Sequence, residues 1–572
     1  MQPISGKIGN TCAGKVSKAL ELAVKENETG VYGIEKEFGF TSSKSLYPLQ
    51  RIGKHSAYHF LMTYGNIPEW AKKKITPEIF DYMIEIGTDP CYSVPEAVKE
   101  AFLIETELWK AINYIRNEFP NIEEILLNHG NLFKPAAITR ENIPNIWGED
   151  KKTYFIEVIN SYGDSLTPQG QHDNISIPEP LVAYQYHRVR KKYSTSSIAY
   201  IEFKNELYIW LASRLRAFAS LIIGISANTP FDYCTENNKD HTVLTGCRSS
   251  RWLKLPQIES SVCPMMLKDY EHFQRNSKRL IDEQVIIGSN NYMPVRPKGE
   301  LRLGEVPLSL ERAAWFHDIV IDDDTINTDP AFSQLRGKKN VPFLTRLKTA
   351  ERSGWLKKKG YTLKEILWKW RKDNVRRLLG VPLNRLEVRC CEISGDIGFE
   401  LAKSSFIQTL VLYIFSNPDF GSKFTYSDDD LKRVVANEFE VAKKGLDATV
   451  LHPYSYKKIT ARDFLKRTLN EIENFAKELG TYEYLLPVIE LSKGEKNQAE
   501  KTIEFTLKRL GNNIEKDSNN RVIVPDEILR DILEIKKQYI NNMTKDTDSK
   551  GINKSDTNNI IDNSNKLSKT IN

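Results

Sequence analysis

The most informative segment of the chain is GVYGIEKEFGF, residues 30–40. Apolar residues alternate here with charged ones, and this period of two predicts a β-strand. In a strand, residues i and i+2 point to the same face, so Glu35 and Glu37 share one face. Ile34 and Phe38 belong to the other face and are apolar. The segment therefore predicts a buried strand whose polar face carries two carboxylates.

Two further strand-like segments carry polar pairs at the same spacing. GQHDNISIPE, residues 170–179, contains His172 and Asn174, and RLEVRCCEI, residues 385–393, contains Glu387 and Arg389. Taken alone, each pair could also belong to a surface strand edge or to an ion pair instead of a functional face. Three carboxylates and a histidine on buried strands would be costly without a partner. A hard divalent cation such as Mg²⁺ offsets that cost, because it binds carboxylate oxygens.

Asp89 and Glu96 extend the list of candidate acidic ligands. Asp89 lies in a Thr-Asp-Pro turn, and Glu96 begins the helix predicted over residues 94–117 by its apolar periodicity. The alternative is structural, since Ser93 and Glu96 have the S-x-x-E spacing of a capping box.

A third type of signal is cationic. Arg296 and Lys298, in the segment YMPVRPK, are candidates to bind ATP phosphates or a substrate carboxylate.

The segment between Ala331 and Gly380 differs in composition from the rest of the chain. Residues 336–377 hold fifteen Lys and Arg against three acidic residues, together with Trp355, Trp368 and Trp370. One interpretation is a phosphate or nucleic-acid surface on which the indole rings stack. We favour a pair of amphipathic helices with a solvated cationic face and buried tryptophans, because charge runs alone specify little.

Two near-matches to known motifs do not meet the requirements of their chemistry. GNTCAGKV, residues 9–16, approaches a phosphate-binding loop, but Val16 stands where Ser or Thr must hold Mg²⁺. The acidic run 322–324 is followed by neither the central Gly nor the closing Glu of a calcium loop. We therefore expect an N-terminal loop at the first and a solvated turn at the second.

Composition sets broad limits on the class of protein. Hydrophobic residues make up 40% and charged residues 27%, which is typical of a soluble globular protein, and the net charge of +6 does not argue for nucleic acid. The seven cysteines include no C-x-x-C pair, which favours a reducing compartment. The apolar segment 207–224 is interrupted by Arg214 and Arg216, so we expect a buried helix over residues 205–227 and no membrane span. Residues 400–416 and 428–541 are predicted to be mostly helical.

In the same order along the chain, these segments resemble the glutamate–cysteine ligase family of the proteobacterial type. GIEKEFGF is similar to its first metal strand, Thr88-Asp89 with Glu96 to its Thr-Asp…Glu segment, and residues 170–174 to its Gly-x-His-x-Asn strand. Residues 292–298 with 304–307 and residues 386–389 match most closely. The resemblance implies an α+β fold with a glutamine-synthetase-like antiparallel catalytic sheet surrounded by helices and a helical C-terminal part. It covers roughly residues 30–510.

Carried over residue by residue, the resemblance also implies a site. Its members are metal ligands, cations near the phosphates or the acyl phosphate, and substrate contacts. Two of the substrate contacts, Tyr154 and Tyr292, also fit packed core positions. The implied ligands of Mg²⁺ or Mn²⁺ are Glu35, Glu37, Asp89, Glu96, His172 and Glu387; the catalytic cations are Arg251 and Arg389; the ATP-binding residues are Arg296 and Lys298; and the substrate-binding residues are Tyr154, Tyr292 and Asn174.

The expected activity is ATP-dependent joining of glutamate to cysteine through a γ-glutamyl phosphate, in the cytoplasm, by a monomer or small oligomer without membrane or nucleic-acid partners. Two residues depart from the family pattern at the thiol pocket, Pro90 and Gln257, which leaves another amine open as the acceptor. A catalytically idle homologue that binds nucleic acid is the alternative of another class. The expected organisation is an extension at 1–29, a catalytic domain at 30–427 with a basic insertion at about 312–380, a helical part at 428–542 and a disordered tail at 543–572.

Overall fold

The computed structural model describes most of the chain from residue 30 to residue 534. The described ranges are 30–144, 167–189, 197–254, 295–298, 319–338, 341–368, 384–417 and 428–534, with isolated positions at 152, 155, 156, 159 and 370. The expected extension at 1–29, the near-match at 9–16 and the expected tail at 543–572 lie outside these ranges.

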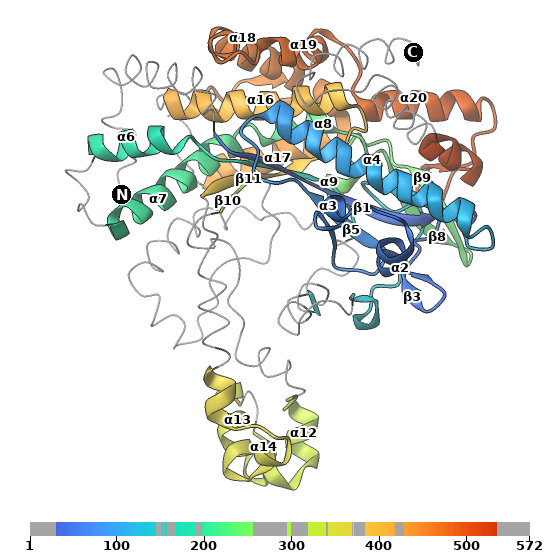
Figure 1. Cartoon of the computed structure of the whole chain (residues 1–572), viewed down its shortest axis with the longest axis vertical. Coiled ribbons are helices and arrows are strands. Elements are labelled where there is room, and N and C mark those ends of the chain that lie inside the picture. The colour runs from blue at the N-terminus through green and yellow to red at the C-terminus, as the bar shows by residue number, and fades with distance from the viewer. Residues whose placement is uncertain are drawn as a thin grey trace.

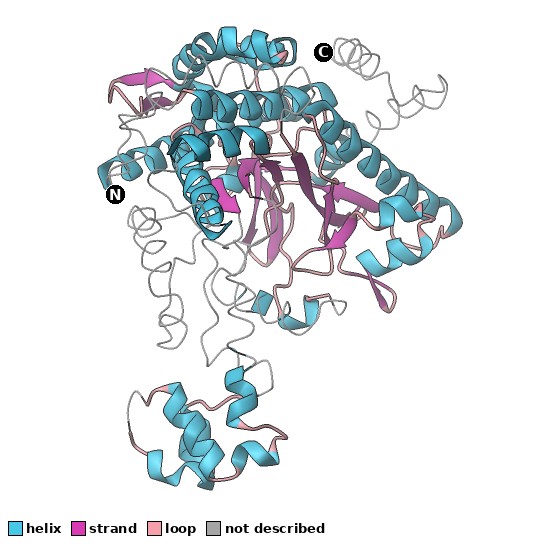
Figure 2. Cartoon of the chain, turned by 60° about the vertical axis from the view of Figure 1, so that its left-hand side comes forward, coloured by secondary structure: helices cyan, strands magenta, loops and turns pink. Residues whose placement is uncertain are grey.

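A seven-stranded antiparallel sheet forms the centre of the main body (Figures 1 and 2). The strand order is β10-β11-β7-β1-β5-β4, and β6 also pairs with β1. The strands span β1 Tyr32–Ser42, β4 Ile75–Pro77, β5 Met83–Gly87, β6 Ile125–Asn128, β7 Gln171–Ile175, β10 Val295–Lys298 and β11 Arg385–Cys391.

The predicted strand around Glu35 is the central strand of this sheet. β1 pairs with β7 through residues 32–36, with β5 through residues 35–39 and with β6 through residues 39–42. Its apolar side chains Ile34, Phe38 and Phe40 are all buried. Glu35 lies opposite His172 on one side and Gly87 on the other, so the register brings polar residues of separate segments together.

Two long helices cover one face of the sheet (Figure 1). α4 spans Val94–Glu118 and packs against β1, and α16 spans Ile397–Ser416 and packs against α4. α4 begins where predicted, because the Ser93 hydroxyl accepts a hydrogen bond from the backbone N–H of Glu96. α16 is long and apolar enough to cross a membrane, but nearly all of it is buried, as in the core helix of a folded domain.

The single helix expected over residues 205–227 is instead two helices, so that prediction is wrong in detail. α7 spans Ser197–Arg216 and α8 spans Ala219–Ser226. Phe218 leaves helical geometry between them and packs against the rings of Tyr454 and Phe464. Because the described residues on both sides of the break, such as Leu215 and Leu221, are buried, the apolar pattern continues through the break and gives no sign of it.

The basic segment belongs to a lobe with its own hydrophobic core, drawn at the bottom of Figure 1. Trp370 is buried in this core and Trp355 packs against it, whereas Trp368 is 59% exposed. Two of the three tryptophans thus have structural roles. The elements of the lobe are α12 Asp323–Thr328, η4 Pro330–Leu335, α13 Phe343–Arg352 and α14 Trp355–Lys358.

The acidic run at 322–324 begins a helix and is not the solvated turn that we expected. The Asp322 carboxylate accepts a hydrogen bond from the backbone N–H of Thr325 and caps α12, while Asp323 and Asp324 lie in its first turn. Carboxylates are favourable there because the N-terminus of a helix carries a partial positive charge.

The remaining elements surround the sheet. They comprise short helices and hairpins near β1, a small sheet of β8, β9 and β14, and the largely helical C-terminal part. Their bounds are β2 Arg51–Ile52, β3 His55–Ser56, α2 Ala57–Tyr64, α3 Glu69–Lys72, η2 Arg140–Asn142, α6 Glu179–Val189, β8 Phe231–Glu236, β9 Lys239–Leu244, α9 Ser250–Lys254, α17 Asp428–Lys444, η5 Gly445–Asp447, β12 Thr449–Leu451, β13 Lys458–Thr460, α18 Ala461–Leu479, η6 Tyr482–Leu485, α19 Leu486–Lys493, α20 Gln498–Leu510 and β14 Val522–Val524.

Candidate functional site

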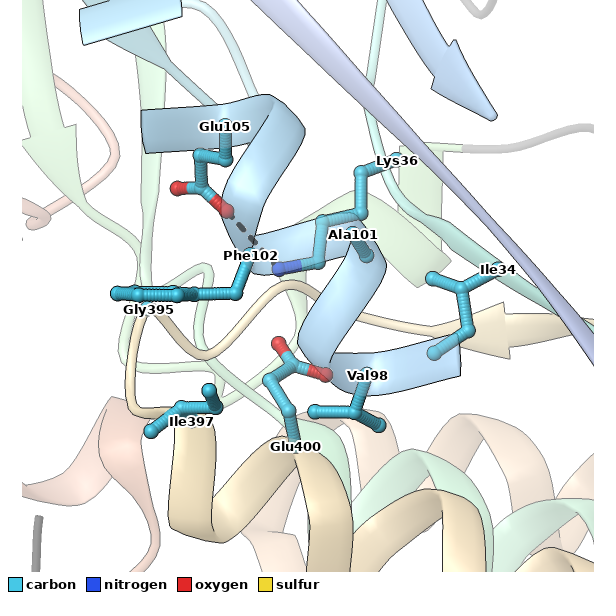
Figure 3. A pocket seen from close by; sticks show the side chains of 9 residues that line it. All are labelled: Ile34, Lys36, Val98, Ala101, Phe102, Glu105, Gly395, Ile397 and Glu400. Atoms are coloured by element: carbon cyan, nitrogen blue, oxygen red, sulfur yellow. Dashed lines mark hydrogen bonds and ion pairs between the residues drawn. The ribbon is translucent and has the colours of Figure 1, made fainter. Parts of the chain in front are cut away.

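The two faces of β1 carry different chemistry. Lys36 points to the helix-covered face, where its Nζ lies 2.9 Å from Glu105 Oε2 on α4. Figure 3 shows Lys36, Glu105 and Glu400 directed toward one another on this face. Burial lowers the pKa of the Lys36 amine, but Glu105 and Glu400 outweigh that effect and raise it. Because side chains alternate along a strand, Glu35 and Glu37 lie on the opposite face of the sheet.

His172 lies at the centre of this opposite face. Its Nδ1 is 3.2 Å from Glu35 Oε2 and 3.6 Å from Glu387 Oε1, and its Nε2 is 3.7 Å from Glu37 Oε1. The antiparallel register explains this proximity, because β7 lies between β1 and β11. Four residues predicted as metal ligands from three separate segments therefore come together.

Two further carboxylates join this group, and the sequence interpretation missed both. Glu85 on β5 lies directly opposite Glu37 on β1. Ligand atoms of Glu35, Glu85 and His172 lie within 4.8 Å of one another, and so do those of Glu37, Glu78 and Glu85. Glu85 is the lone charged residue of the strand MIEIG, which was a usable signal; Glu78 lies before β5 in a loop and gave none.

Electrostatic repulsion at this group is strong. Like charges directly opposite on neighbouring strands destabilise a sheet. Burial, and then the neighbouring carboxylates led by Glu78 and Glu35, raises the pKa of Glu85 well above its ordinary value. A bound divalent cation would reverse this balance, because carboxylate oxygens are the ligands that Mg²⁺ and Mn²⁺ prefer. The donor set thus fits a metal site.

Arg251 approaches the group from α9. Its side chain is among the largest fully buried ones, and its guanidinium occupies the space where a Cβ on Gly170 would lie. The backbone N–H of Gly170 donates a hydrogen bond to Glu37 Oε2, at 3.0 Å. The glycine therefore allows a cation and a carboxylate to approach the same short backbone segment at the start of β7.

The structure describes only some of the other predicted cations and substrate contacts. Arg389 Nε lies 3.8 Å from Glu387 Oε1, on the same face as the carboxylates. Arg296 is the register partner of Glu387, but the side chains of Arg296 and Lys298 lie outside the described part of the chain, as do Tyr154 and Tyr292. Asn174 is described and buried, and its Oδ1 accepts a hydrogen bond from Arg385 Nε at 2.8 Å.

Asp89 and Glu96 are not brought into either carboxylate group. Asp89 Oδ2 lies 2.5 Å from Lys74 Nζ, and its side chain is 74% exposed. Glu96 Oε2 accepts a hydrogen bond from the backbone N–H of Tyr92, one residue before the Ser93 that a full capping box requires. Both residues therefore have structural partners here, and metal binding by them stays a prediction.

Comparison with known proteins agrees with this architecture. The model of glutamate-cysteine ligase family 2 (GCS2) matches residues 190–505, more than half of the chain. The chain belongs to glutamate-cysteine ligase family 2. Membership of this family indicates a ligase of the glutamate–cysteine ligase type.

Similarity to a solved structure shows the fold. The glutamate–cysteine ligase (gshA) of Francisella tularensis, solved in complex with AMP, aligns over 95% of this chain and 98% of its own, with a TM-score of 0.50 and 13% identity. A bifunctional glutathione synthetase from Pasteurella multocida aligns over 93% of this chain and 55% of its own, with a TM-score of 0.46 and 12% identity. The predicted α+β class, an antiparallel catalytic sheet surrounded by helices, is confirmed.

Proposed function

We propose that this family member joins the γ-carboxylate of L-glutamate to the amine of L-cysteine at the expense of ATP, giving γ-glutamylcysteine, as in the first step of glutathione biosynthesis. One observation carries the proposal: His172 and the carboxylates of Glu35, Glu37 and Glu85 meet on one face of a buried sheet. Like charges crowded onto one face of a sheet are costly unless a cation binds there.

The proposed metal ligands are those of this group. Glu35, Glu37, Glu85 and His172 would hold Mg²⁺ or Mn²⁺, with Glu387 adjacent to the imidazole. When bound, a divalent cation would neutralise charge on the ATP phosphates. Asp89 and Glu96 remain proposed ligands for which the described contacts offer no support.

The proposed reaction has two steps that balance. A γ-carboxylate oxygen of glutamate attacks the γ-phosphorus of ATP, the bond to the β–γ bridging oxygen breaks, and ADP leaves. The amine then attacks the acyl carbon, its proton is lost, and phosphate departs with the former carboxylate oxygen. Arg251 and Arg389 would stabilise the charge on the transferred phosphoryl group, and Arg296 and Lys298 would bind ATP. The reaction needs no covalent enzyme intermediate.

The identity of the amine rests on less support than the activation of the carboxylate. Tyr154, Tyr292 and Asn174 are the proposed substrate contacts. Pro90 stands where the family pattern has one wall of the thiol pocket, and in the structure it lines a cavity beside Glu35. This observation favours a second candidate, a glutamate ligase of the same fold that uses a different amine.

ADP release measured with Mg²⁺ and glutamate, with and without cysteine, tests the proposal. We expect turnover that needs both amino acids, and the highest kcat/KM for cysteine within a panel of amines. Glu35→Ala should abolish ADP formation while the protein stays folded, and full activity in that variant would refute the metal assignment. Tight, steeply salt-dependent RNA or DNA binding without ATP turnover would instead support the idle homologue.

The proposed reaction also bears on the compartment in which the protein works. We propose that the protein is cytoplasmic, because ATP is the co-substrate and free thiols are tolerated in a reducing compartment. We also propose that it is a monomer or a small oligomer. The cysteines of the described ranges agree with this, since Cys91, Cys234, Cys247, Cys390 and Cys391 are all free thiols.

A further inference from the structure

A cavity of about 160 Å³ opens on the carboxylate face, directly beside the proposed metal ligands. Its polar lining includes Glu35, Asn174 and Arg385 together with the hydroxyl residues Tyr32, Thr88 and Ser176, and Glu35 belongs to both the cavity and the carboxylate group. Pockets for drug-sized ligands usually measure about 300–1,000 Å³, so this volume suits a small molecule. The rest of the lining that matters here is Gly33 and Pro90.

Arg385 gives this cavity a cationic side. It lies two residues before Glu387 on β11 and therefore points to the same face of the sheet. Its Nε donates to Asn174 Oδ1 at 2.8 Å, and Asn174 is itself buried, so the fork is held in one orientation. Among the described residues, no carboxylate lies within ion-pair distance of Arg385. A guanidinium fixed through Nε presents its two Nη groups as a site for a carboxylate.

Gly33 lines the same cavity as the Arg385 guanidinium and leaves space in it. It pairs with Asn174 across β1 and β7, and a Cβ added at Gly33 would lie 3.7 Å from both Asn174 Cβ and Thr88 Oγ1. Those are ordinary contact distances, so alanine would fit at this position without strain. A larger side chain would extend into the cavity that Gly33 leaves open.

We propose that Arg385 and Asn174 form the clamp for the α-carboxylate of an amino-acid substrate, in a subsite whose volume depends on Gly33. This inference rests on the proposed function, because it assigns a substrate subsite within the same site. A small α-amino acid fits the cavity in size, and its carboxylate complements the cation. Both substrates of the proposed reaction carry an α-carboxylate, so the experiment must determine which of them occupies the clamp.

The test compares the wild type with Arg385→Gln on two matched substrate pairs. 4-Aminobutyrate is glutamate without its α-carboxylate, and cysteamine is cysteine without its carboxylate. We expect the KM of one amino acid to rise about 10- to 100-fold in the variant, with its preference over the decarboxylated partner lost. The KM of ATP should not change. Loss of discrimination in the glutamate pair assigns the clamp to glutamate, and loss in the cysteine pair assigns it to the acceptor.

Arg116→Gln is the matched control, because Arg116 is an exposed arginine on α4 that pairs with Glu124. It removes the same charge far from the carboxylate face and should leave both preferences intact. Retained discrimination in both pairs by Arg385→Gln would overturn the proposal. So would a fall in kcat for all four compounds without a change in preference.

Calorimetric titration with glutamate and with cysteine separates this inference from the proposed reaction. If the wild type forms no ADP, the proposed function fails, yet binding still decides on the clamp. The proposed clamp is supported if the wild type binds either amino acid and both Arg385→Gln and Gly33→Val lose that binding. Absence of binding in the wild type, or equal binding in the variants, would overturn it. Circular dichroism confirms that the variants are folded.

Discussion

His172 Nδ1 lies 3.2 Å from Glu35 Oε2 and 3.6 Å from Glu387 Oε1, so one imidazole on β7 contacts carboxylates of both neighbouring strands. This relationship follows from the sheet order, in which β7 separates β1 from β11. It places the imidazole, the proposed nitrogen ligand, at the centre of an oxygen-rich group. Residues that orient metal ligands are nearly as important to affinity as the ligands themselves.

Replacing His172 should therefore weaken metal binding. We expect His172→Ala to lower Mn²⁺ affinity by at least about 10-fold, measured by electron paramagnetic resonance titration, because it removes a ligand and a contact of two others. His59→Ala on α2 is the matched control, since His59 is exposed. Equal affinity in the two variants would contradict the assignment of His172.

Glu85 offers a test that separates binding from folding. Because burial, and then crowding by carboxylates, raises the pKa of Glu85, a neutral isostere should be tolerated in the metal-free protein. We expect Glu85→Gln to leave the metal-free Tm unchanged or higher, and to reduce the rise in Tm that saturating Mn²⁺ produces. A variant that is unfolded without metal, or fully stabilised by it, would show that Glu85 is a structural residue.

Gly170 tests the placement of Arg251. A Cβ at Gly170 would overlap the buried guanidinium, so Gly170→Ala must displace either the backbone of β7 or Arg251. We expect a loss of about 1–3 kcal/mol in the free energy of unfolding, measured with urea, and a marked fall in ADP formation. Gly87→Ala is the stability control, because a Cβ at Gly87 meets nothing within 4 Å. Wild-type stability and turnover in Gly170→Ala would be inconsistent with the close approach.

A buried ion pair away from the site should dominate the stability of the C-terminal part. Arg216 Nε lies 2.7 Å from Glu438 Oε1, and both side chains are almost fully buried. Removing one partner leaves an uncompensated charge, so Glu438→Ala should cost about 3–5 kcal/mol in urea unfolding. Glu440→Ala, on the same helix α17 but in a more exposed pair with Lys444, should change stability by less than about 0.5 kcal/mol. Similar costs for the two variants would refute this account of the pair.

Local pattern was sufficient to predict the strands of the site but not all of its members. Alternation around Glu35 and Glu37 predicted both the strand and the shared face, and the same rule applied to His172 and Glu387. Their convergence depends on long-range register, which no local pattern encodes, and only the ordered family resemblance indicated it. Glu85 was missed because a single carboxylate between isoleucines has no partner at i+2.

The other differences between the expectations and the structure have equally specific causes. The break at Phe218 is set by tertiary packing against Tyr454 and Phe464, and continuous burial hides it in the sequence. Metal binding by Asp89 and Glu96 stays a prediction, and their described partners are Lys74 and a backbone N–H, which the motif does not reveal. Arg385 escaped notice because its role depends on a cavity that only the assembled sheet creates.

The central claim is that the chain activates a carboxylate by phosphorylation, and oxygen transfer tests it most directly. Glutamate labelled with ¹⁸O in the γ-carboxylate is incubated with ATP, Mg²⁺ and cysteine, and the released phosphate is analysed by mass spectrometry. We predict one ¹⁸O atom in each phosphate, because the carboxylate oxygen leaves with it when the amine attacks. Unlabelled phosphate, or label in AMP, would contradict an acyl-phosphate intermediate and with it the proposed function.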